Sequence, residues 1–321
     1  MGEFDLIDLI RRRTGAARAD VRLGIGDDAA VLALPMEREL VACSDTLTAG
    51  VHFPLDTLPG DIGWKALAVN LSDLAAMGAF PAWVLLALTV PAADRAFVEA
   101  FADGFAELAA PLQIALVGGD TTEGPLSATV TALGFVPPGT YLRRDGARPG
   151  DEVFVTGSLG DAAAGLHCIN AGRTGASESH RAALVERLNR PQPRLAAGAA
   201  LRGVASACID LSDGLLADLA HVAAASGVAI EIDVSRLPTS AALLASFDRA
   251  MRLEWQLGGG DDYELAFTVS PQRASDLVGD ISRLGCGAAR IGRVVTGQGV
   301  RAFDADGGEV AAGARGWRHF T

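Results

Sequence analysis

The sequence is short of cysteine, which excludes two kinds of covalent framework. Its 321 residues include four cysteines, none of them in a CxxC pair: Cys43, Cys168, Cys208 and Cys286. Structural zinc sites need closely spaced cysteine or histidine pairs, and small secreted domains depend on several disulfides. Neither pattern is present, so we expect reduced thiols in a cytoplasmic protein.

Long hydrophobic runs are also missing. The longest apolar run, Trp83 to Val90, is much shorter than the roughly 20 residues that a transmembrane helix needs. Residues 1–5 are acidic and do not resemble a secretory signal peptide. We therefore expect no membrane partner.

Positive charge is scarce. The chain has 27 lysine and arginine residues against 39 aspartate and glutamate residues, so its formal net charge is −12. A nucleic-acid surface would show clustered basic residues, and we expect no nucleic-acid partner. Lys65 is the only lysine; one helical turn before Val69, it is interpreted as a solvated residue rather than a phosphate contact. The many arginines fit either codon composition or bidentate phosphate binding by a few of them.

The common nucleotide-binding motifs are absent. The sequence contains no GxxxxGK[ST] segment, no HRD or DFG triplet and no dinucleotide fingerprint. These absences exclude a P-loop enzyme, a protein kinase and a Rossmann dehydrogenase. Any nucleotide would have to be bound by a different arrangement of residues.

Length and patterning predict a two-domain α/β (α+β) protein. Half of the residues are hydrophobic, which allows a full core, and 321 residues fit two domains better than one. Predicted strands and helices mix throughout both halves. The turn-rich stretch between Pro137 and Asp151 predicts the boundary, with domains at residues 1–148 and 149–321.

The predicted elements place the polar segments at strand ends. In the first half we expect strands over residues 29–34, 40–43, 83–90, 114–117 and 126–136, and helices over 4–13, 62–77 and 95–109. In the second half we expect strands over 152–156, 205–209, 228–232, 263–269 and 289–294, and helices over 161–169, 180–188, 193–201, 215–225, 240–246 and 271–284. Gly78 is the predicted stop of the 62–77 helix.

Five short segments place carboxylates beside glycine, a hydroxyl or apolar residues. They are Gly26-Asp27-Asp28, Ser44-Asp45-Thr46, the surroundings of Asp73, Gly118-Gly119-Asp120-Thr121 and Asp210-Leu211-Ser212-Asp213-Gly214. Asp73 lies in an otherwise apolar helix, on the same face as Asn70. A buried carboxylate without a partner is costly, so it is protonated, paired or bound to a metal. We interpret the five segments as one acidic pocket for hard cations.

Magnesium suits such a pocket. It takes oxygen ligands, usually one or two carboxylates together with waters and substrate phosphates. A reaction between two phosphate-bearing molecules would need several such ions. The candidate ligands are Asp28, Asp45, Asp73, Asp120, Asp210 and Asp213, with the Ser44 hydroxyl as a ligand or hydrogen-bond donor. The Gly118-Gly119 pair would let backbone approach a phosphate closely.

Each segment also has a structural interpretation. The 27–28 pair fits a turn, Asp120 fits an ordinary loop acid, and the 212–213 pair fits a helix N-cap, which can coexist with metal binding. For any single segment the structural interpretation is preferred. Asp73 differs because its apolar setting demands a partner. Three segments at strand ends together favour a common site.

The ordered set of motifs resembles the thiamine-monophosphate kinase family. The motifs are GIGDDAA (24–30), SDTLTAGVHF (44–53), KALAVNLSDLAAMGA (65–79), GGDTTEGPL (118–126), IDLSDGL (209–215) and GGGDDYEL (258–265). The resemblance covers nearly the full length and ends with GWRHF at residues 316–320. It implies the aminoimidazole-ribonucleotide synthetase-like fold, in which the N-terminal domain pairs strands with its copy in a homodimer. It also implies the reaction of ATP with thiamine phosphate to give ADP and thiamine diphosphate, assisted by several Mg²⁺ ions.

The resemblance further implies the residues that serve the reaction. The metal ligands would be Asp28, Cys43, Ser44, Asp45, Asp73, Asp120, Asp210 and Asp213. ATP would contact Gly119, Asp120, Arg144 and Ser212, and thiamine phosphate would contact His52, Asp261 and Trp317. The transition state would be supported by Asp45, Asp120 and Arg144. No acid or base is expected, because a phosphate nucleophile needs little deprotonation at neutral pH.

Some of these positions depart from the family or have other interpretations. Cys43 is a poor magnesium ligand through its thiol, so any contact would use its carbonyl, and family members often have glutamate at the position of Asp261. Trp317 fits either stacking on the substrate or anchoring of the C-terminal segment. His52 and Arg144 fit either phosphate contacts or structural roles.

Related activities and a different class remain as alternatives. A selenophosphate-forming relative would carry a reactive cysteine before Cys43, and a hydrogenase-maturation relative would end in cysteine rather than Thr321. A ring-closing synthetase of the same superfamily is a third possibility. A non-catalytic nucleotide sensor would bind ATP with magnesium and form no product.

Overall fold

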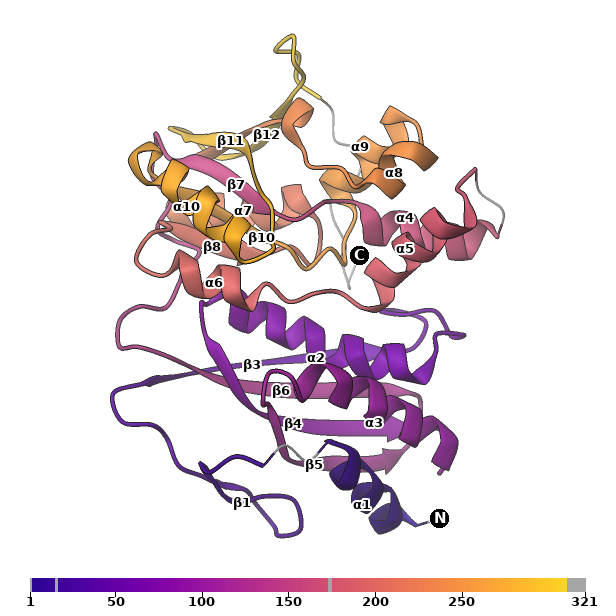
Figure 1. The fold of residues 1–321 in the computed structure, drawn as a ribbon. Helices are drawn as coiled ribbons and strands as arrows, with labels where there is room; N and C mark the ends of the chain where they lie inside the picture. The colour runs from indigo at the N-terminus through magenta and orange to yellow at the C-terminus, as the bar shows by residue number, and fades with distance from the viewer. Residues whose placement is uncertain (1, 15–16, 173–174, 311–321) are drawn as a thin grey trace. The chain divides into compact units, whose positions relative to one another are not determined.

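The structure, a computed structural model, describes residues 2–14, 17–172 and 175–310 (Figure 1). The chain forms two compact units, which are described separately. The first comprises Met1–Leu74 and Ala79–Gly139, and the second comprises Ala75–Gly78 and Thr140–Thr321. Residues 140–148, expected at the end of the first domain, therefore group with the second unit.

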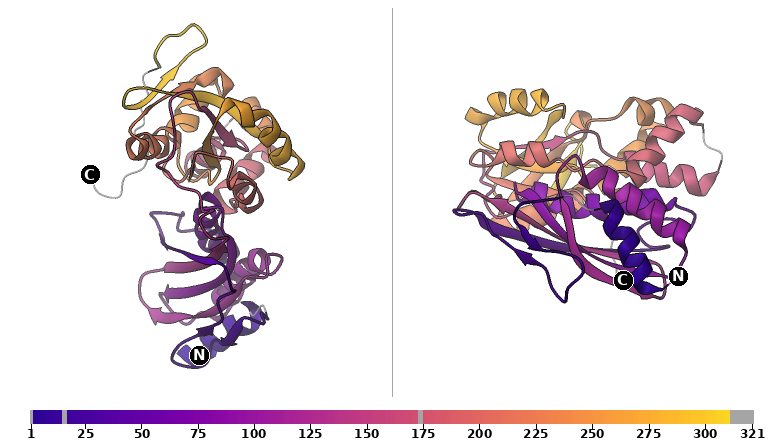
Figure 2. Two further views of the ribbon diagram at one scale, coloured as in Figure 1. Left: turned by 90° about the vertical axis from the view of Figure 1, so that its left-hand side faces the viewer. Right: turned by 60° about the horizontal axis from the view of Figure 1, so that its bottom comes forward.

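The first unit contains one four-stranded sheet and its helices. The elements are α1 (Glu3–Thr14), β1 (Val21–Leu23), β2 (Val31–Leu32), β3 (Glu39–Thr48), α2 (Pro59–Ala76), β4 (Phe80–Val90), α3 (Arg95–Ala109), β5 (Ala115–Glu123) and β6 (Ser127–Val136). The strand order is β3-β6-β4-β5, with β4 and β5 parallel and the other neighbours antiparallel. The helices α2 and α3 lie on one face of this sheet (Figures 1 and 2). β1 and β2 form a separate pair.

The two faces of this sheet differ in polarity because side chains alternate along each strand. Val130 of β6 is buried, whereas its neighbours Thr129 and Thr131 are only half-buried. On the half-buried face, which carries Thr129 and Thr131, hydroxyl groups pair between strands. The Ser44 and Thr131 oxygens are 2.9 Å apart, and the Thr46 and Thr129 oxygens are 2.8 Å apart. Around these pairs, the side of the sheet away from α2 is therefore lined with hydroxyl groups.

The helices α2 and α3 cross where both carry glycine. A Cβ atom on Gly104 would lie 1.9 Å from the carbonyl oxygen of Gly60, and one on Gly63 would lie 2.0 Å from that of Phe101. No side chain fits at these distances. The glycines therefore set how closely the two backbones approach.

The second unit is built on a six-stranded mixed sheet. The elements are β7 (Glu152–Thr156), α4 (Asp161–Ala171), α5 (Glu178–Asn189), α6 (Leu195–Leu201), β8 (Ala207–Asp210), α7 (Leu215–Ser226), β9 (Ala229–Asp233), η1 (Val234–Arg236), α8 (Ala241–Ser246), α9 (Arg249–Gly258), β10 (Leu265–Val269), α10 (Pro271–Arg283), β11 (Ala288–Val295) and β12 (Gly299–Phe303). The order is β12-β9-β11-β7-β10-β8, and only β12 and β9 are parallel neighbours.

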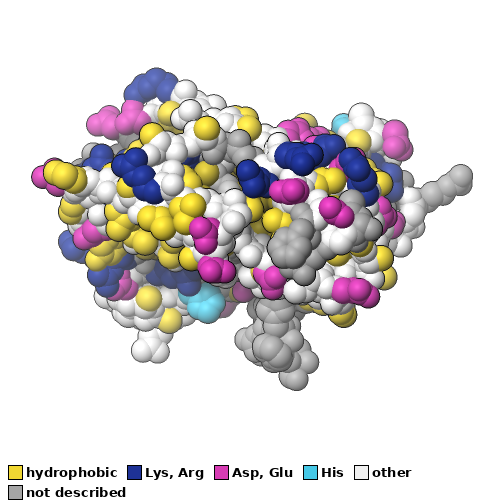
Figure 3. All heavy atoms as spheres, turned by 90° about the horizontal axis from the view of Figure 1, so that it is seen from below, with side chains coloured by type: hydrophobic (Ala, Val, Ile, Leu, Met, Phe, Trp, Pro, Cys, Tyr) yellow, Lys and Arg dark blue, Asp and Glu magenta, His cyan; other side chains and the backbone are white. Residues whose placement is uncertain are grey.

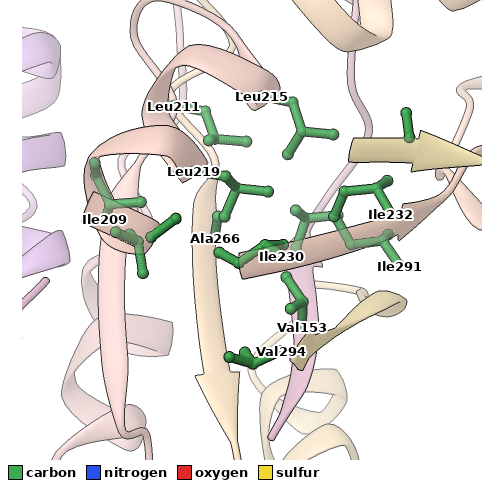
Figure 4. Close-up of a cluster of buried hydrophobic side chains, with 14 of the residues drawn as sticks. Val153, Ile209, Leu211, Leu215, Leu219, Ile230, Ile232, Ala266, Ile291 and Val294 are labelled. Carbon is green, nitrogen blue, oxygen red and sulfur yellow. The ribbon is translucent and has the colours of Figure 1, made fainter. Parts of the chain in front are cut away.

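Both faces of this second sheet are buried around β7 and β10. Val153 and Val155 of β7 belong to a core cluster that includes Leu219 of α7, part of which is drawn in Figure 4. Phe154, between them, packs on the opposite side against Phe267, with ring centroids 5.5 Å apart. Burial on both faces explains why these strands appear in the sequence as continuous apolar runs.

Most predicted elements are confirmed within a few residues, and the α/β mixture holds in both units. β1, η1, α9 and β12 were not predicted. α9 has a recognisable start, because the Asp248 side chain accepts a hydrogen bond from the Met251 amide at 3.0 Å, as an N-cap does. Every helix within the described ranges is too short or too polar to cross a membrane.

Replacement of Gly104 by alanine tests the close crossing of α2 and α3. Glycine to alanine in an open helix stabilises by about 1 kcal/mol. Here the added methyl would meet the Gly60 carbonyl, so we expect a loss of about 1–3 kcal/mol in the free energy of unfolding, measured with urea. Gly24→Ala is the control, because its Cβ would make only an ordinary contact, 3.5 Å from Val21. Equal effects of both changes would contradict the crossing.

Candidate functional site

The first acidic cluster lies between β3 and α2. Alternation along β3 turns Cys43 and Asp45 towards the helix. The Cys43 thiol donates to the Asn70 carbonyl at 3.3 Å, and the Asp45 amide donates to Asn70 Oδ1 at 3.0 Å. Asn70 is fully buried, and its side-chain nitrogen donates to the Ala66 carbonyl. One helical side chain thus holds the strand in register with α2.

Asp73, on the same face of α2 as Asn70, completes this cluster. A side-chain hydrogen bond joins Asp45 and Asp73, and another joins Asp73 and Cys43. Burial raises the pKa of Asp45, and burial with the two nearby carboxyl groups raises the pKa of the Cys43 thiol. Two carboxyl groups this close need a proton or a cation between them. The pair therefore fits a cation site.

His52 lies beside the same pair and is held by the backbone around it. Its Nδ1 accepts a hydrogen bond from the Thr48 amide at 2.9 Å, and the ring is close enough to Asp45 for a protonated imidazole to lower the pKa of that carboxyl. Lys65 donates to the His52 carbonyl at 3.1 Å. Lys65 is only 2% exposed, so the prediction of a solvated lysine is wrong. The reason is that α2 presents this position to the 48–53 segment rather than to water.

Ser44 faces the other side of β3. Its hydroxyl is close to the Thr131 hydroxyl and donates to the Val130 carbonyl at 3.2 Å. The side chains of Ser44 and Asp45 therefore lie on opposite faces of the sheet. A single ion cannot be bound by both side chains, whatever each binds separately.

A cavity of about 850 Å³ brings two other segments of the first unit together. Asp28 and Asp120 both line it, together with the backbone of Gly118 and Gly119 and the Arg11 side chain of α1. The Asp28 amide donates to the Asp27 side chain at 2.9 Å. Gly26 forms a turn and residues 28–29 a bend, close to the predicted turn at 27–28, and this segment lines the same cavity as Asp120.

Gly118 to Asp120 lie within β5, not in a loop after it, and Ser44 and Asp45 likewise lie within β3. Pairing continues past these positions because the neighbouring strands are long enough to bond to them. Gly119 has φ +150° and its Cβ would lie 1.8 Å from the Leu86 carbonyl oxygen. Close packing on β4 therefore already requires glycine at this position.

In the second unit, two motifs pair through their backbones. We name them the 210–214 segment and the 258–264 segment. The Asp261 amide donates to the Ser212 carbonyl at 2.9 Å, and the Tyr263 amide donates to the Leu211 carbonyl at 2.8 Å. A Cβ on Gly260 would lie 2.6 Å from the Ser212 oxygen. Glycine thus allows the two segments to lie against each other.

Asp218 joins Asp210 and Asp213 in an acidic group that the sequence alone did not reveal. Its carboxylate accepts hydrogen bonds from the Asp213 and Gly214 amides, both at 3.1 Å, at the start of α7. Burial and the neighbouring Asp210 and Asp213 raise the pKa of Asp218 to about 7. Asp210 is itself only 5% exposed. The position of Asp218 in the first turn of α7 was the sequence signal that could have predicted its interaction with the helix N-terminus.

The remaining predicted residues differ in what the structure describes. The Arg144 side chain is exposed, and its carbonyl accepts a hydrogen bond from the Ser226 hydroxyl at 3.0 Å. Asp261 has a left-handed backbone with φ 68°. Trp317 lies outside the described residues.

The acidic side chains form pairs and small groups within each unit. Among the residues that the structure describes, no three His, Cys, Asp or Glu side chains are gathered to hold a metal ion by themselves. Magnesium is usually held by one or two carboxylates, with waters and phosphates completing its shell. The Asp45–Asp73 pair, and Asp28 and Asp120 beside one cavity, fit that mode of binding.

Comparison with known proteins gives matches over the whole chain. Residues 26–136 match the family described as AIR synthase related protein, N-terminal domain, and residues 148–305 match the corresponding C-terminal domain. The chain is 46% identical to thiamine-monophosphate kinase of Salmonella typhimurium over 320 residues, which cover 100% of this chain and 98% of that protein.

Solved structures agree with these matches. The crystal structure of thiamine-monophosphate kinase from Stenotrophomonas maltophilia has a TM-score of 0.88 and 50% identity, covering 97% of this chain and 98% of that one. A structure described as AaThiL complexed with AMPPCP and TMP has a TM-score of 0.78 and 35% identity, covering 99% of this chain and 97% of that one.

Substitution of Asp218 tests its hydrogen bonds to the 210–214 segment. Asp218→Ala removes the acceptor for two backbone amides, and we expect a loss of about 1–3 kcal/mol in the free energy of unfolding. Asp218→Asn keeps an acceptor oxygen and removes a buried charge, so it should retain most of the stability. Urea unfolding in the presence of a chelator measures both. Equal losses in the two variants would show that the hydrogen bonds are not the cause.

Proposed function

The chain belongs to the thiamine-monophosphate kinase family of AIR synthase related proteins, and we propose that it transfers the γ-phosphate of ATP to thiamine monophosphate, forming ADP and thiamine diphosphate. The observation that carries this proposal is the match to AaThiL complexed with AMPPCP and TMP, which covers 99% of this chain. A match of that extent includes both units.

The chemistry of the acidic residues supports phosphoryl transfer with magnesium. We propose that Asp28, Asp45, Asp73, Asp120, Asp210 and Asp213 hold magnesium ions, with Ser44 and the Cys43 carbonyl as further oxygen donors. Bound magnesium would neutralise phosphate charge and orient both reactants. The Asp45–Asp73 hydrogen bond supports this proposal, because a cation would relieve the proximity of the two carboxyl groups.

The substrate contacts are proposals of the same kind. ATP is proposed to contact Gly119, Asp120, Arg144 and Ser212, and thiamine phosphate to contact His52, Asp261 and Trp317. The arrangement around His52 supports its role: Nδ1 accepts from the Thr48 amide, so a neutral ring carries its proton on Nε2. That nitrogen can donate a hydrogen bond to a phosphate oxygen.

The proposed reaction needs no general base. The phosphate oxygen of thiamine monophosphate is already ionised at neutral pH, so it can attack the γ-phosphorus in line without losing a proton. Positioning of the reactants, and neutralisation of phosphate charge by Arg144 and by the magnesium ions that Asp45 and Asp120 would hold, would then supply most of the catalysis.

We also propose a homodimer in the cytoplasm. The first unit exposes large hydrophobic side chains, including Val31, Leu34, Met36 and Leu40, which are 52%, 59%, 89% and 47% exposed. Hydrophobic side chains gather over part of the face drawn in Figure 3. Contiguous exposed apolar surface of this kind favours association with another chain.

An assay of ADP release tests the acceptor. Purified protein with ATP and magnesium should release ADP rapidly with thiamine phosphate, and only at background rate with thiamine or with no acceptor. Product analysis should show one thiamine diphosphate for each ADP. Magnesium-dependent ATP binding without ADP release would instead indicate a nucleotide sensor, and strong activity on thiamine would contradict the proposed acceptor.

Asparagine substitutions test the proposed magnesium ligands. Asp45→Asn and Asp120→Asn should each lower kcat by about a hundredfold or more, by analogy with the loss of one transition-state-stabilising group. Asp280→Asn is the control, because Asp280 pairs with Arg283 on the exposed side of α10. Near-normal turnover of either variant at saturating magnesium would remove that residue from the proposed ligand set.

A further inference from the structure

Glu264 is a buried carboxylate to which the proposed mechanism gives no role. It directly precedes β10 and its exposed fraction is 0%. Arg187 Nη2 donates to its Oε1 at 2.8 Å, and Arg194 Nε donates to its Oε2 at 2.6 Å. The Thr156 hydroxyl also donates to Oε2 at 2.6 Å. Such partners are needed, because a buried carboxylate without them is strongly destabilising. We call these four residues the Glu264 cluster.

The backbone is shaped around this carboxylate. Gly157 has φ 58°, and a Cβ atom there would lie 2.1 Å from Glu264 Oε1. The Thr156 oxygen that donates to Glu264 also accepts from the Leu265 amide at 2.8 Å. The end of β7 and the start of β10 therefore both pack against the Glu264 side chain.

The Glu264 cluster is bonded directly to the 210–214 segment and to the rest of the 258–264 segment, of which Glu264 is the last residue. The Glu264 carbonyl accepts from the Leu211 amide at 2.8 Å, and Arg187 Nη2 also donates to the Asp262 carbonyl at 3.4 Å. The first bond holds the 210–214 segment, and the second holds the 258–264 segment. Arg187 lies on α5 and Arg194 directly precedes α6, so the cluster connects these helices to the two segments.

The 258–264 segment has a conformation that needs such support. Asp261 and Tyr263 are both left-handed, with φ 68° and 49°, which is uncommon for residues other than glycine. Asp262, between them, is 4% exposed, and its carboxylate accepts from the Gly160 amide at 2.8 Å. Strained backbone of this kind persists only where the surroundings fix it, and it gathers at functional sites.

We propose that Arg187, through its bonds to Glu264 and to the Asp262 carbonyl, is a positioning residue for the kinase reaction. It sets the backbone of the 258–264 segment so that Asp261 faces thiamine phosphate. Because the Asp261 amide is bonded to the Ser212 carbonyl, it also positions the 210–214 segment so that Ser212 faces ATP. This inference rests on the proposed function, and it adds a role for residues to which that function assigns no substrate contact. Arg194 and Thr156 donate hydrogen bonds to the same carboxylate and so fix the position of the acceptor that Arg187 binds.

The chain contains a control for this arrangement. Glu231 is also held by two arginines: Arg293 Nη2 donates to it at 2.8 Å and Arg301 Nη2 donates at 2.9 Å. These residues lie on β9, β11 and β12 of the same unit. Neither the 210–214 segment nor the 258–264 segment is bonded to them in the described residues. Arg293→Met thus removes an arginine–glutamate ion pair away from both segments, although this pair is more exposed: the Arg293 and Glu231 side chains are 66% and 17% exposed, against 21% and 0% for Arg187 and Glu264.

The test compares Arg187→Met, Arg187→Lys and Arg293→Met by steady-state kinetics and hydrogen exchange. Arg187→Met should raise KM for thiamine phosphate by about tenfold, the lower range for residues that support a ligand. Amides of the 210–214 and 258–264 segments should exchange faster in the absence of substrates. Arg187→Lys should recover part of both effects. Arg293→Met should change neither the KM nor the exchange of the two segments.

The outcomes separate positioning from a purely structural role. A lower melting temperature with unchanged KM and unchanged exchange in the two segments would overturn the proposal, as would equal effects in Arg187→Met and Arg293→Met. Should Arg187→Met not fold, Glu264→Gln, which keeps the shape of the side chain, takes its place with the same expectations. Failure of the wild-type protein to phosphorylate thiamine phosphate would refute the proposed function, and the exchange comparison would then decide the positioning by itself.

Discussion

The need of buried carboxylates for partners governs the arrangement of this protein. Desolvation makes an isolated carboxylate in a core too costly to keep ionised, so each one is hydrogen-bonded, protonated or placed where a cation can reach it. Asp45 and Asp73 share a hydrogen bond. Asp218 accepts hydrogen bonds from two backbone amides, and Glu264 accepts hydrogen bonds from two arginines. The Asp45–Asp73 pair is compatible with a bound cation. Glu264 already has its cations and supports the neighbouring backbone.

Glycine sets the distances that these groups require. Gly119 allows β5 to pack against β4 beside Asp120, and Gly260 allows the 258–264 segment to lie on Ser212. Any larger residue would push the backbones apart, and the acidic side chains would move with them. The glycines in the motifs therefore act through close backbone contact within the protein. An approach of the same backbone to phosphate, at Gly118 and Gly119, is compatible with this packing.

The sequence predicted regular elements well where one apolar pattern dominates. The bounds of α3 and β7 agree with the predicted 95–109 and 152–156 ranges. It failed where polar residues continue a strand, because Ser44, Asp45 and Asp120 read as loop chemistry although their backbones are in a hydrogen-bonded ladder. It also misjudged Lys65, since periodicity within one helix does not tell which neighbour covers a long polar side chain.

The sequence by itself determined the class of elements, the acidic motifs, their order and the resemblance to one kinase family. These properties follow from local residue patterns, which can be recognised without knowing the long-range contacts. Only the tertiary structure decided that Asp45 meets Asp73, that Ser44 faces the opposite side, and that Asp28 and Asp120 share a cavity. It alone brought Arg187 and Arg194 to Glu264. Such contacts join residues far apart in the chain, and their geometry depends on how strands pair and helices pack.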